Sequence, residues 1–320
     1  MSTIRVAAVQ AAPVFLNLDA SLDRLSALTA QAASQGAQLV AFGESWLPGY
    51  PAWLDMCEGA ALWGDAASRD VFVRLMDNAV EFPSPAATRL AEVAHANGVV
   101  LVVGAHERAG RTLFNSALTF GPDGTLLNRH RKLIPTYSER LIWGQGDGAG
   151  LRAPITDLGR VGTLICWEHW MPLTRQAMHD EHEDIHVALW PAVHDMHLVA
   201  SRHYGFEGRC FVLAVGSLLR LAEMPKELTM AARYQGPPEK LLLTGGSAII
   251  GPDGKILAGP CFDEERILLA DCDLTAIRQQ AMTLDVSGHY SRPDIFDFQV
   301  NRRAFPVSAA ERSAAAPRQD

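Results

Sequence analysis

The first 42 residues carry a strand, a helix and a second strand in close succession. Residues 4–9 form an apolar run of strand length. Asn17 can cap the helix that follows, whose apolar side chains recur at helical spacing until Gly36 ends it. Residues 38–42 form a second buried strand. A strand–helix–strand unit of this length predicts an α/β fold, in which helices cover at least one face of a sheet.

The stretch 160–172 places a cysteine at a turn between a strand and a helix. Residues 161–165 are typical of a buried strand, and Pro172 can be the first residue of a helix. Cys166 lies between them, where a cleft gives access and the positive end of a helix favours the thiolate. We interpret Cys166 as a nucleophile. The alternative is a small core residue, because free cysteine is among the most buried residue types.

The tetrapeptide Gly-Pro-Asp-Gly occurs at 121–124 and again at 251–254, each time between two strand-like runs. Each copy is typical of a hairpin turn. We interpret the repetition as pseudo-symmetry: two related α/β halves whose sheets lie face to face with helices outside. The alternative is that this tetrapeptide is simply a common turn.

Three polar residues stand at the ends of predicted strands or hairpins: Glu44, Lys132 and Cys166. Ligands collect outside the carboxyl ends of strands in α/β sheets, so these side chains can converge. Lys132 can stabilise a thiolate, and Glu44 can transfer the protons that thiol chemistry releases. Taken separately, a surface lysine and a solvated glutamate are the simpler interpretations.

Composition narrows the classes of function. With 320 residues, 48% of them hydrophobic, the chain can bury a large core, and we expect one domain over 1–307 with a disordered tail over 308–320. A formal charge of −8 argues against nucleic-acid binding. The five cysteines lack the spacing of a disulfide framework, and neither a leader nor a membrane-spanning run is evident, so we expect a cytoplasmic protein.

Three motifs make the chain resemble the nitrilase superfamily of carbon-nitrogen hydrolases. They are Gly-Glu-Ser-Trp-Leu-Pro-Gly-Tyr-Pro at 43–51, His-Arg-Lys-Leu-Ile-Pro-Thr at 130–136 and Ile-Cys-Trp-Glu-His at 165–169. The resemblance extends from residue 6 to residue 293 and implies a four-layer α-β-β-α sandwich. It also implies a catalytic triad of Glu44, Lys132 and Cys166, accompanied by Glu139 as a second, structurally placed glutamate.

Within the superfamily the chain is most similar to the true nitrilases. Cys-Trp-Glu at 166–168 and Trp-Gly-Gln-Gly-Asp-Gly at 143–148 carry this likeness, whereas amidase branches have Cys-Tyr-Asp. The resemblance implies attack of the cysteine on a nitrile, a thioimidate and then a thioester, with release of ammonia and a carboxylic acid and no cofactor or metal. It also implies a homo-oligomer, either a dimer or a larger spiral, for which segments 46–82 and 221–240 are the candidate contacts. Amide or carbamoyl hydrolysis is the alternative reaction, and an inert binding protein on the same fold is the alternative class.

All seven tryptophans fall between Glu44 and Pro191, near the three polar candidates. Aromatic side chains of this kind line apolar pockets for small organic molecules. Core packing is the alternative for part of them. His169 stands where many nitrilases have asparagine, which leaves the choice of nitrile open. The residues that we expect to contact the substrate are Tyr50, Trp167, His169 and Trp190.

A competing motif, His-Glu-x-x-His, spans His182 to His186. A zinc site of this kind needs both histidines on one continuous helix. His186 instead opens an apolar run that is typical of a strand. We therefore expect no metal at this motif.

Overall fold

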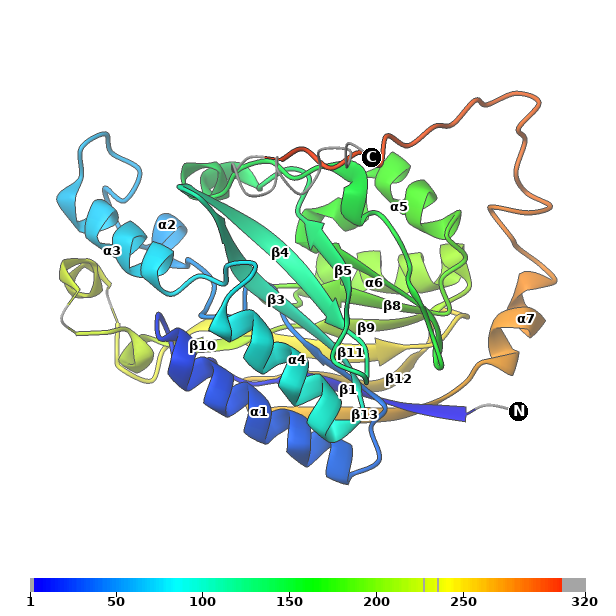
Figure 1. The fold of residues 1–320 in the computed structure, drawn as a ribbon, viewed down its shortest axis with the longest axis horizontal. Coiled ribbons are helices and arrows are strands. Elements are labelled where there is room, and N and C mark those ends of the chain that lie inside the picture. Colours follow the sequence, from blue (N-terminus) through cyan, green and yellow to red (C-terminus); the bar gives the residue numbers. More distant parts are fainter. Residues whose placement is uncertain (1–2, 227, 235, 307–320) are drawn as a thin grey trace, which may run out of the picture.

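The computed structural model describes residues 3–226, 228–234 and 236–306, in which two sheets form the centre of the molecule (Figure 1). The first sheet has six strands in the order β13-β1-β2-β3-β4-β5. Its strands are β1 (Thr3–Gln10), β2 (Leu39–Phe42), β3 (Val100–Ala109), β4 (Thr112–Phe120), β5 (Leu126–Arg131) and β13 (Arg266–Asp273). The predicted tail over 308–320 lies outside the described residues.

The second sheet has seven strands, with β10-β11-β9-β8-β7-β6 in order and β12 paired with β11. Its strands are β6 (Ile155–Thr156), β7 (Gly159–Ile165), β8 (Ile185–Leu189), β9 (Phe211–Val215), β10 (Leu218–Arg220), β11 (Leu241–Ile250) and β12 (Ile256–Phe262).

The two sheets share one topology, which confirms the predicted pseudo-symmetry. Strands β1, β2 and β3 are parallel and β4 and β5 continue antiparallel; β7, β8 and β9 are likewise parallel and are followed by β11 and β12. The two Gly-Pro-Asp-Gly turns occupy equivalent places. Gly121 N–H donates to Thr125 O and Gly251 N–H to Lys255 O, both over 2.8 Å.

Helices cover the outer face of each sheet, which completes an α-β-β-α sandwich (Figure 1). Alternate residues of β1 separate the layers: Val6 and Ala8 pack toward the second sheet, whereas Ala7 and Val9 pack under α1 and α4. The helices are α1 (Leu18–Ser34), α2 (Trp53–Met56), α3 (Ala66–Asp77), α4 (Pro85–Asn97), α5 (Pro172–His179), α6 (Asp195–Gly208) and α7 (Thr275–Ala281). None of the helices in the described ranges is long and apolar enough to cross a membrane.

Side-chain caps start both α1 and α4, and the cap at Asn17 agrees with its prediction. Asn17 accepts the N–H of Ala20, and Ser84 accepts the N–H of Ala87 ahead of Pro85. Gly98 ends α4 in the left-handed region, with φ at 61°.

The basic run 129–132 lies largely within a strand, because β5 continues through Arg131. Strand pairing carries these charges into the interior, where neighbouring carboxylates compensate them. His130 contacts Glu168, and Arg131 pairs with Glu107. Only Lys132 follows the strand.

Segments 46–82 and 221–240 pack together at one end of the molecule and form a lobe beside the sheets (Figure 1). Arg233 pairs with Asp65 over 2.6 Å, and Cys57 and Met230 share an apolar cluster. We call the described part of these two segments the end lobe. Residues 221–240 contain two 3-10 helices, η4 (Leu221–Glu223) and η5 (Thr229–Arg233).

Candidate active site

The carboxyl ends of β2, β5 and β7 meet where the two sheets face each other. Glu44 follows β2, Lys132 follows β5 and Cys166 follows β7. The N–H of Glu44 donates to the carbonyl of Trp190 over 3.1 Å, so the end of β2 is tied to the end of β8 in the other sheet. Gly104 permits this bend, because a Cβ there would lie 2.3 Å from the carbonyl oxygen of Gly43.

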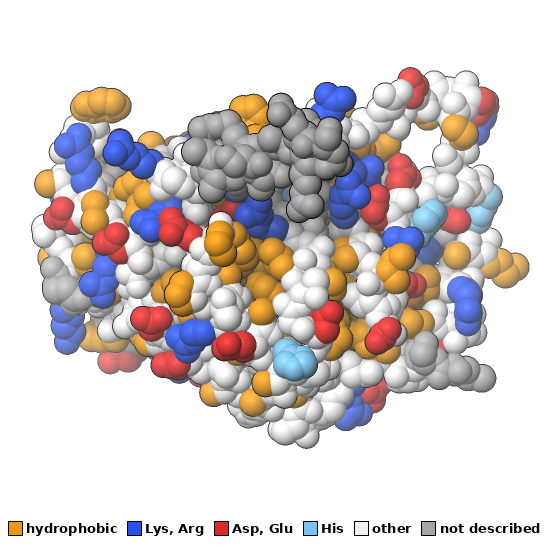
Figure 2. Space-filling view, viewed as in Figure 1, with side chains coloured by type: hydrophobic (Ala, Val, Ile, Leu, Met, Phe, Trp, Pro, Cys, Tyr) orange, Lys and Arg blue, Asp and Glu red, His pale blue; other side chains and the backbone are white. Residues whose placement is uncertain are grey.

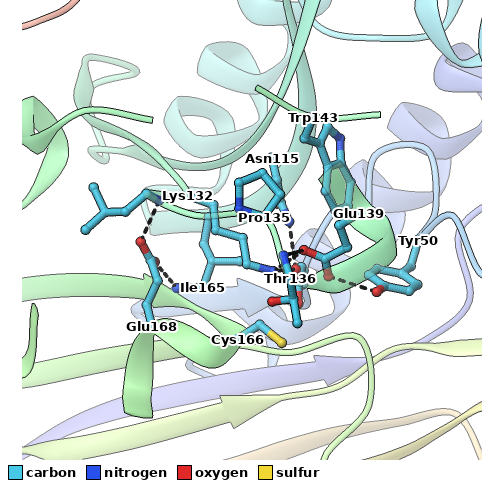
Figure 3. Close-up of polar contacts among 12 residues, drawn as sticks. Tyr50, Asn115, Lys132, Pro135, Thr136, Glu139, Trp143, Ile165, Cys166 and Glu168 are labelled. Carbon is cyan, nitrogen blue, oxygen red and sulfur yellow. Dashed lines mark hydrogen bonds and ion pairs between the residues drawn. The ribbon is translucent and has the colours of Figure 1, made fainter. Parts of the chain in front are cut away.

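The ammonium of Lys132 lies between two carboxylates (Figure 3). Its Nζ donates to Glu44 Oε1 over 2.8 Å and to Glu139 Oε2 over 2.7 Å. Asn115 Nδ2 also donates to Glu44 Oε1, over 2.6 Å. Burial alone lowers the pKa of Lys132, but the charges of Glu44, Cys166 and Glu139 raise it above its ordinary value. The site therefore holds a permanent cation.

Glu139 is held in place from three sides. It lies in a 3-10 helix, η1 (Tyr137–Leu141), and accepts the backbone N–H of Thr136 over 2.7 Å. The hydroxyl of Tyr50 donates to its other oxygen, Oε1, over 2.9 Å. With Lys132 on Oε2 as well, this carboxylate is suited to orienting the ammonium.

Cys166 lies beside this group at the start of a further 3-10 helix, η3 (Cys166–Trp170), with φ at 54° (Figure 3). Burial, and then the charge of Glu44, raise the pKa of its thiol well above the ordinary value, although Lys132 lowers it. This direction differs from the expected stabilisation of a thiolate. Two carboxylates share a dry crevice with one ammonium, so the protonated thiol is favoured.

Glu44 has the properties of a proton acceptor for that thiol. Its side chain is fully buried, and burial raises its pKa to about 7 against the opposing charge of Lys132. Its Oε2 atom has no hydrogen-bond partner among the described residues. A carboxylate with a pKa near neutrality is matched to general-base work.

Glu168 ties the cysteine turn to the lysine segment, a role that sequence reasoning missed. Its Oε2 accepts the N–H of Ile165 over 2.7 Å, and its Oε1 accepts the N–H of Leu133 over 2.9 Å. His130 Nε2 lies 2.9 Å from Oε2. Burial raises the pKa of Glu168, but the charge of His130 and these hydrogen bonds lower it overall. The signal for this role was the glutamate within Cys-Trp-Glu itself.

The glycine-rich run 143–148 packs against the lysine segment. Gly146 N–H donates to the carbonyl of Lys132 over 2.8 Å, and a Cβ at Gly146 would lie 2.1 Å from the carbonyl oxygen of Arg131. The ring of Trp143 lies 6.0 Å from the Lys132 ammonium. The run therefore needs glycine because its backbone lies directly against β5.

A pocket of about 950 Å³ opens onto Cys166. Three of the predicted site residues, Tyr50, Glu139 and Trp167, line it. Other lining residues come mainly from the segments that follow the lysine and the cysteine: Ile134, Pro135, Thr136, Tyr137, Ser138, Arg140, Trp170, Met171, Pro191 and His197.

His169 and Trp190 lie behind the pocket wall, so the prediction that they contact the substrate is not supported. Both are buried, and their rings stack at a centroid distance of 4.8 Å. His169 Nδ1 is 2.7 Å from the carbonyl oxygen of Cys166, and Trp190 Nε1 donates to Ser201. These buried side chains lie beneath the cysteine turn, where packing separates them from the pocket. His169 supports the turn through its contact with the Cys166 carbonyl.

The tryptophans separate into several environments. Only Trp167 and Trp170 line the pocket among the described residues. Trp63 is fully exposed on the end lobe. The remaining four, Trp46, Trp53, Trp143 and Trp190, are buried in the core.

The His-Glu-x-x-His motif does not lie on a helix. Helix α5 ends at His179, His182 lies in a turn with φ at 56°, and His186 is in β8. Within the described part of the chain, no group of three or more His, Cys, Asp and Glu side chains is arranged to hold a metal ion. Two of its residues, Glu183 and His186, belong instead to a buried hydrogen-bonded chain beneath the cysteine.

Several proteins are similar to this chain over nearly its whole length. Nitrilase 3 of Arabidopsis thaliana is 40% identical over 94% of this chain and 87% of its own length. An aliphatic nitrilase of Sinorhizobium fredii (strain HH103) is 38% identical over 97% of this chain and 98% of its own length. A bifunctional nitrilase/nitrile hydratase of Nicotiana tabacum is 37% identical, covering 98% of this chain and 91% of its own length.

Solved structures share the fold at lower sequence identity. A carbon-nitrogen hydrolase from Helicobacter pylori G27 superposes with a TM-score of 0.70 at 19% identity, covering 92% of this chain and 97% of that one. Nit3 of Saccharomyces cerevisiae gives a TM-score of 0.67 at 17% identity, covering 91% and 97%. A sequence model of the carbon-nitrogen hydrolase family matches residues 5–282, and the chain belongs to this family.

Proposed function

We propose that this enzyme, a nitrilase, hydrolyses an organic nitrile to the carboxylic acid and ammonia, with Cys166 as nucleophile and Glu44, Lys132 and Glu139 as its catalytic partners. The observation that carries the assignment is the Lys132 ammonium, held 2.8 Å from Glu44 and 2.7 Å from Glu139 beside a cysteine that opens onto the pocket. The similarity to named nitrilases supports the nitrile as substrate.

The first step adds the thiol across the carbon–nitrogen triple bond. Glu44 takes the proton from Cys166 as the sulfur–carbon bond forms, and the proton then passes to the nitrile nitrogen, giving a thioimidate. Lys132 stabilises the negative charge that develops on this nitrogen, and the backbone N–H of Trp167 is a second donor. A thiol with a raised pKa suits this coupled transfer, because the proton leaves only when attack occurs.

Two waters complete the reaction. Glu44 takes a proton from the first water as it attacks the thioimidate carbon, and protonation of the nitrogen releases ammonia and leaves a thioester. The second water attacks the thioester, which releases the acid and returns the proton to the thiol. The nitrile and two waters thus yield one acid and one ammonia, without a cofactor.

The decisive experiment compares ammonia release from aliphatic, aromatic and arylaliphatic nitriles with release from the matching amides, with the acid quantified alongside. Acid from nitriles with little turnover of amides supports the proposal. Turnover confined to amides would assign the protein to amide hydrolysis. No turnover of either would assign it to an inert binding role.

The chain forms one domain over 1–307 and resides in the cytoplasm. Its topology supports the single domain, because β13 near the end of the chain pairs with β1 at the start. All five cysteines are buried and free, as suits a reducing compartment. Fluorescence of a tagged full-length chain in its host would test the location.

The chain also assembles with copies of itself. The end lobe supports this assignment because it exposes the apolar side chains of Leu62, Trp63 and Val73 to solvent. Figure 2 shows hydrophobic side chains among charged ones at this end of the molecule. We expect light scattering to give a mass above 34.8 kDa for the wild type and a lower mass for Trp63→Glu. A monomeric wild type would contradict the assignment.

A further inference from the structure

Four buried side chains form one hydrogen-bonded chain beneath the Cys166 turn. His169 Nδ1 lies 2.7 Å from the carbonyl oxygen of Cys166, and His169 Nε2 lies 3.0 Å from His186 Nε2. His186 Nδ1 lies 2.8 Å from Glu183 Oε1. The hydroxyl of Tyr204 donates to Glu183 Oε2 over 2.5 Å. Two of these residues are members of the His-Glu-x-x-His motif that the reaction does not use.

The carbonyl end fixes the direction of every hydrogen bond in the chain. A carbonyl oxygen only accepts, so His169 carries its proton on Nδ1 and, as a neutral ring, accepts at Nε2. His186 must then donate from its Nε2. The bond between His186 and Glu183 needs one further proton, because a neutral His186 with its proton on Nε2 would otherwise present a lone pair to a carboxylate. That proton lies either on Glu183 or on His186.

We propose that Glu183 is a neutral carboxylic acid in the working enzyme and that, through His186 and His169, it is a positioning residue for the peptide group of Cys166. Its side chain is 1% exposed and that of His186 is 0% exposed. A neutral acid and a neutral ring require no desolvated charge, whereas the alternative places an imidazolium and a carboxylate in the core. The effect on rate rests on the proposed nitrile hydrolysis; the protonation state does not.

The surroundings of Glu183 favour the neutral form. Burial raises its pKa to about 8, although the hydrogen bond from Tyr204 and the charge of His179 lower it. Burial also lowers the pKa of His169 to about 3 and that of His186 well below its ordinary value. The titratable and charged groups around Glu183 are His186 on β8, His179 on α5, Tyr204 and Glu207 on α6, and Glu181, His182, Asp184, Arg209, Cys210 and Asp285 in the adjoining turns.

Glu183 is packed against the strand that carries the nucleophile. A Cβ at Gly162 in β7 would lie 1.5 Å from Glu183 Oε1, so only glycine leaves room for this carboxyl group. On its other side Glu183 lines a hollow of about 160 Å³.

The held carbonyl directs the N–H of the next residue. The C=O of Cys166 and the N–H of Trp167 belong to one planar trans peptide, so they point in opposite directions. With the carbonyl held toward His169 beneath the turn, the Trp167 N–H points to the opposite side, where the thioimidate nitrogen forms. The chain from Glu183 thus orients a donor of the reaction without touching the substrate.

Loss of the Glu183 proton would break this arrangement. An ionised Glu183 requires a donor at His186 Nδ1, which leaves His186 Nε2 a lone pair opposite the lone pair of His169 Nε2. His169 would have to move its proton to Nε2 and lose its bond to the Cys166 carbonyl. Activity should therefore fall as the pH rises through the pKa of Glu183.

Glutamine separates the two protonation states, because its amide donates to His186 and accepts from Tyr204 as a neutral acid does. We expect Glu183→Ala to lower kcat at least tenfold and Glu183→Gln to recover most of that loss and to remove the alkaline fall in kcat. Tyr204→Phe keeps the aromatic ring stacked on His186 but removes the hydrogen bond to Glu183, which favours the ionised carboxylate. This variant should therefore show the alkaline fall in kcat at a higher pH than the wild type. If Glu183 is ionised in the wild type, kcat of Glu183→Gln will instead fall as far as kcat of Glu183→Ala.

An infrared difference spectrum of wild type minus Glu183→Gln tests the proton without any turnover. We expect the C=O stretch of a protonated carboxylic acid at neutral pH. Carboxylate bands in its place would overturn the proposal, even if nitrile hydrolysis is confirmed. If the wild type does not hydrolyse nitriles, the proposed reaction is contradicted. The infrared spectrum still decides whether Glu183 is protonated.

Discussion

His130 Nε2 lies 2.9 Å from the carboxylate of Glu168, and both side chains are fully buried. Through this contact and the N–H groups of Ile165 and Leu133, one carboxylate joins the strand that ends at the lysine to the strand that ends at the cysteine. The relative position of Lys132 and Cys166 therefore depends on a residue that takes no part in the chemistry.

Glu168→Gln tests this dependence. A glutamine side chain accepts through its oxygen but not through its nitrogen. Either the N–H of Ile165 or the N–H of Leu133 would therefore face the amide NH₂ group, a second donor, in the core. We expect a stability loss of about 1–3 kcal/mol and a fall in kcat/KM of at least tenfold, measured by urea denaturation and steady-state kinetics. Glu92→Gln, at an exposed position on α4, is the matched control and should change neither quantity. An unaltered kcat/KM in Glu168→Gln would mean that the turn is held without it.

Cys166→Ala should abolish turnover and leave the fold intact, because the change removes a reacting atom and only a small packing volume. Turnover is measured as ammonia release, and the fold by circular dichroism. Mass spectrometry of wild type quenched during turnover should show an adduct on Cys166. Cys261→Ala, in β12, is the control and should remain active. Turnover by Cys166→Ala would refute the nucleophile assignment.

The activity should rise with pH through about 7, where burial places the pKa of Glu44. A general base must be ionised, so kcat/KM should fall about tenfold for each unit of pH below the pKa. Glu44→Gln should lose about 10²–10⁴-fold in rate and lose this acid limb as well. The measurement is a pH profile of kcat/KM for both proteins. An acid limb that persists unchanged in Glu44→Gln would assign it to another group.

Tyr50→Phe separates a positioning role from substrate binding. The hydroxyl of Tyr50 donates to Glu139 Oε1 over 2.9 Å, and its ring lines the pocket. Loss of a hydrogen bond to a charged group costs about 1.5–3 kcal/mol, so we expect kcat to fall about tenfold or more with little change in KM. Tyr137→Phe removes a hydroxyl from another pocket residue that is largely exposed and is the control. A raised KM with unchanged kcat would instead place the Tyr50 hydroxyl on the substrate.

Local patterns predicted the elements well where one short segment carried the whole signal. Asn17 starts α1, and the two Gly-Pro-Asp-Gly turns close equivalent hairpins. The burial of the basic run 129–132 could not be predicted from the sequence, because its charges are neutralised by partners such as Glu107 and Glu168 that lie far away in the chain. A strand can bury charge only when such partners exist, and no local pattern reveals them.

The sequence by itself determined the α/β sandwich, its two related halves and the reaction class, because strand and helix periodicity and three motif segments are local properties of the chain. Tertiary structure decided the rest. It raised the pKa of the Cys166 thiol, buried His169 and Trp190 beneath the pocket, and placed Glu168 and Glu183 in hydrogen-bonded contacts around the cysteine turn. The physical reason is that desolvation and hydrogen bonding between distant strands set protonation and orientation, and both arise only when the two sheets pack together.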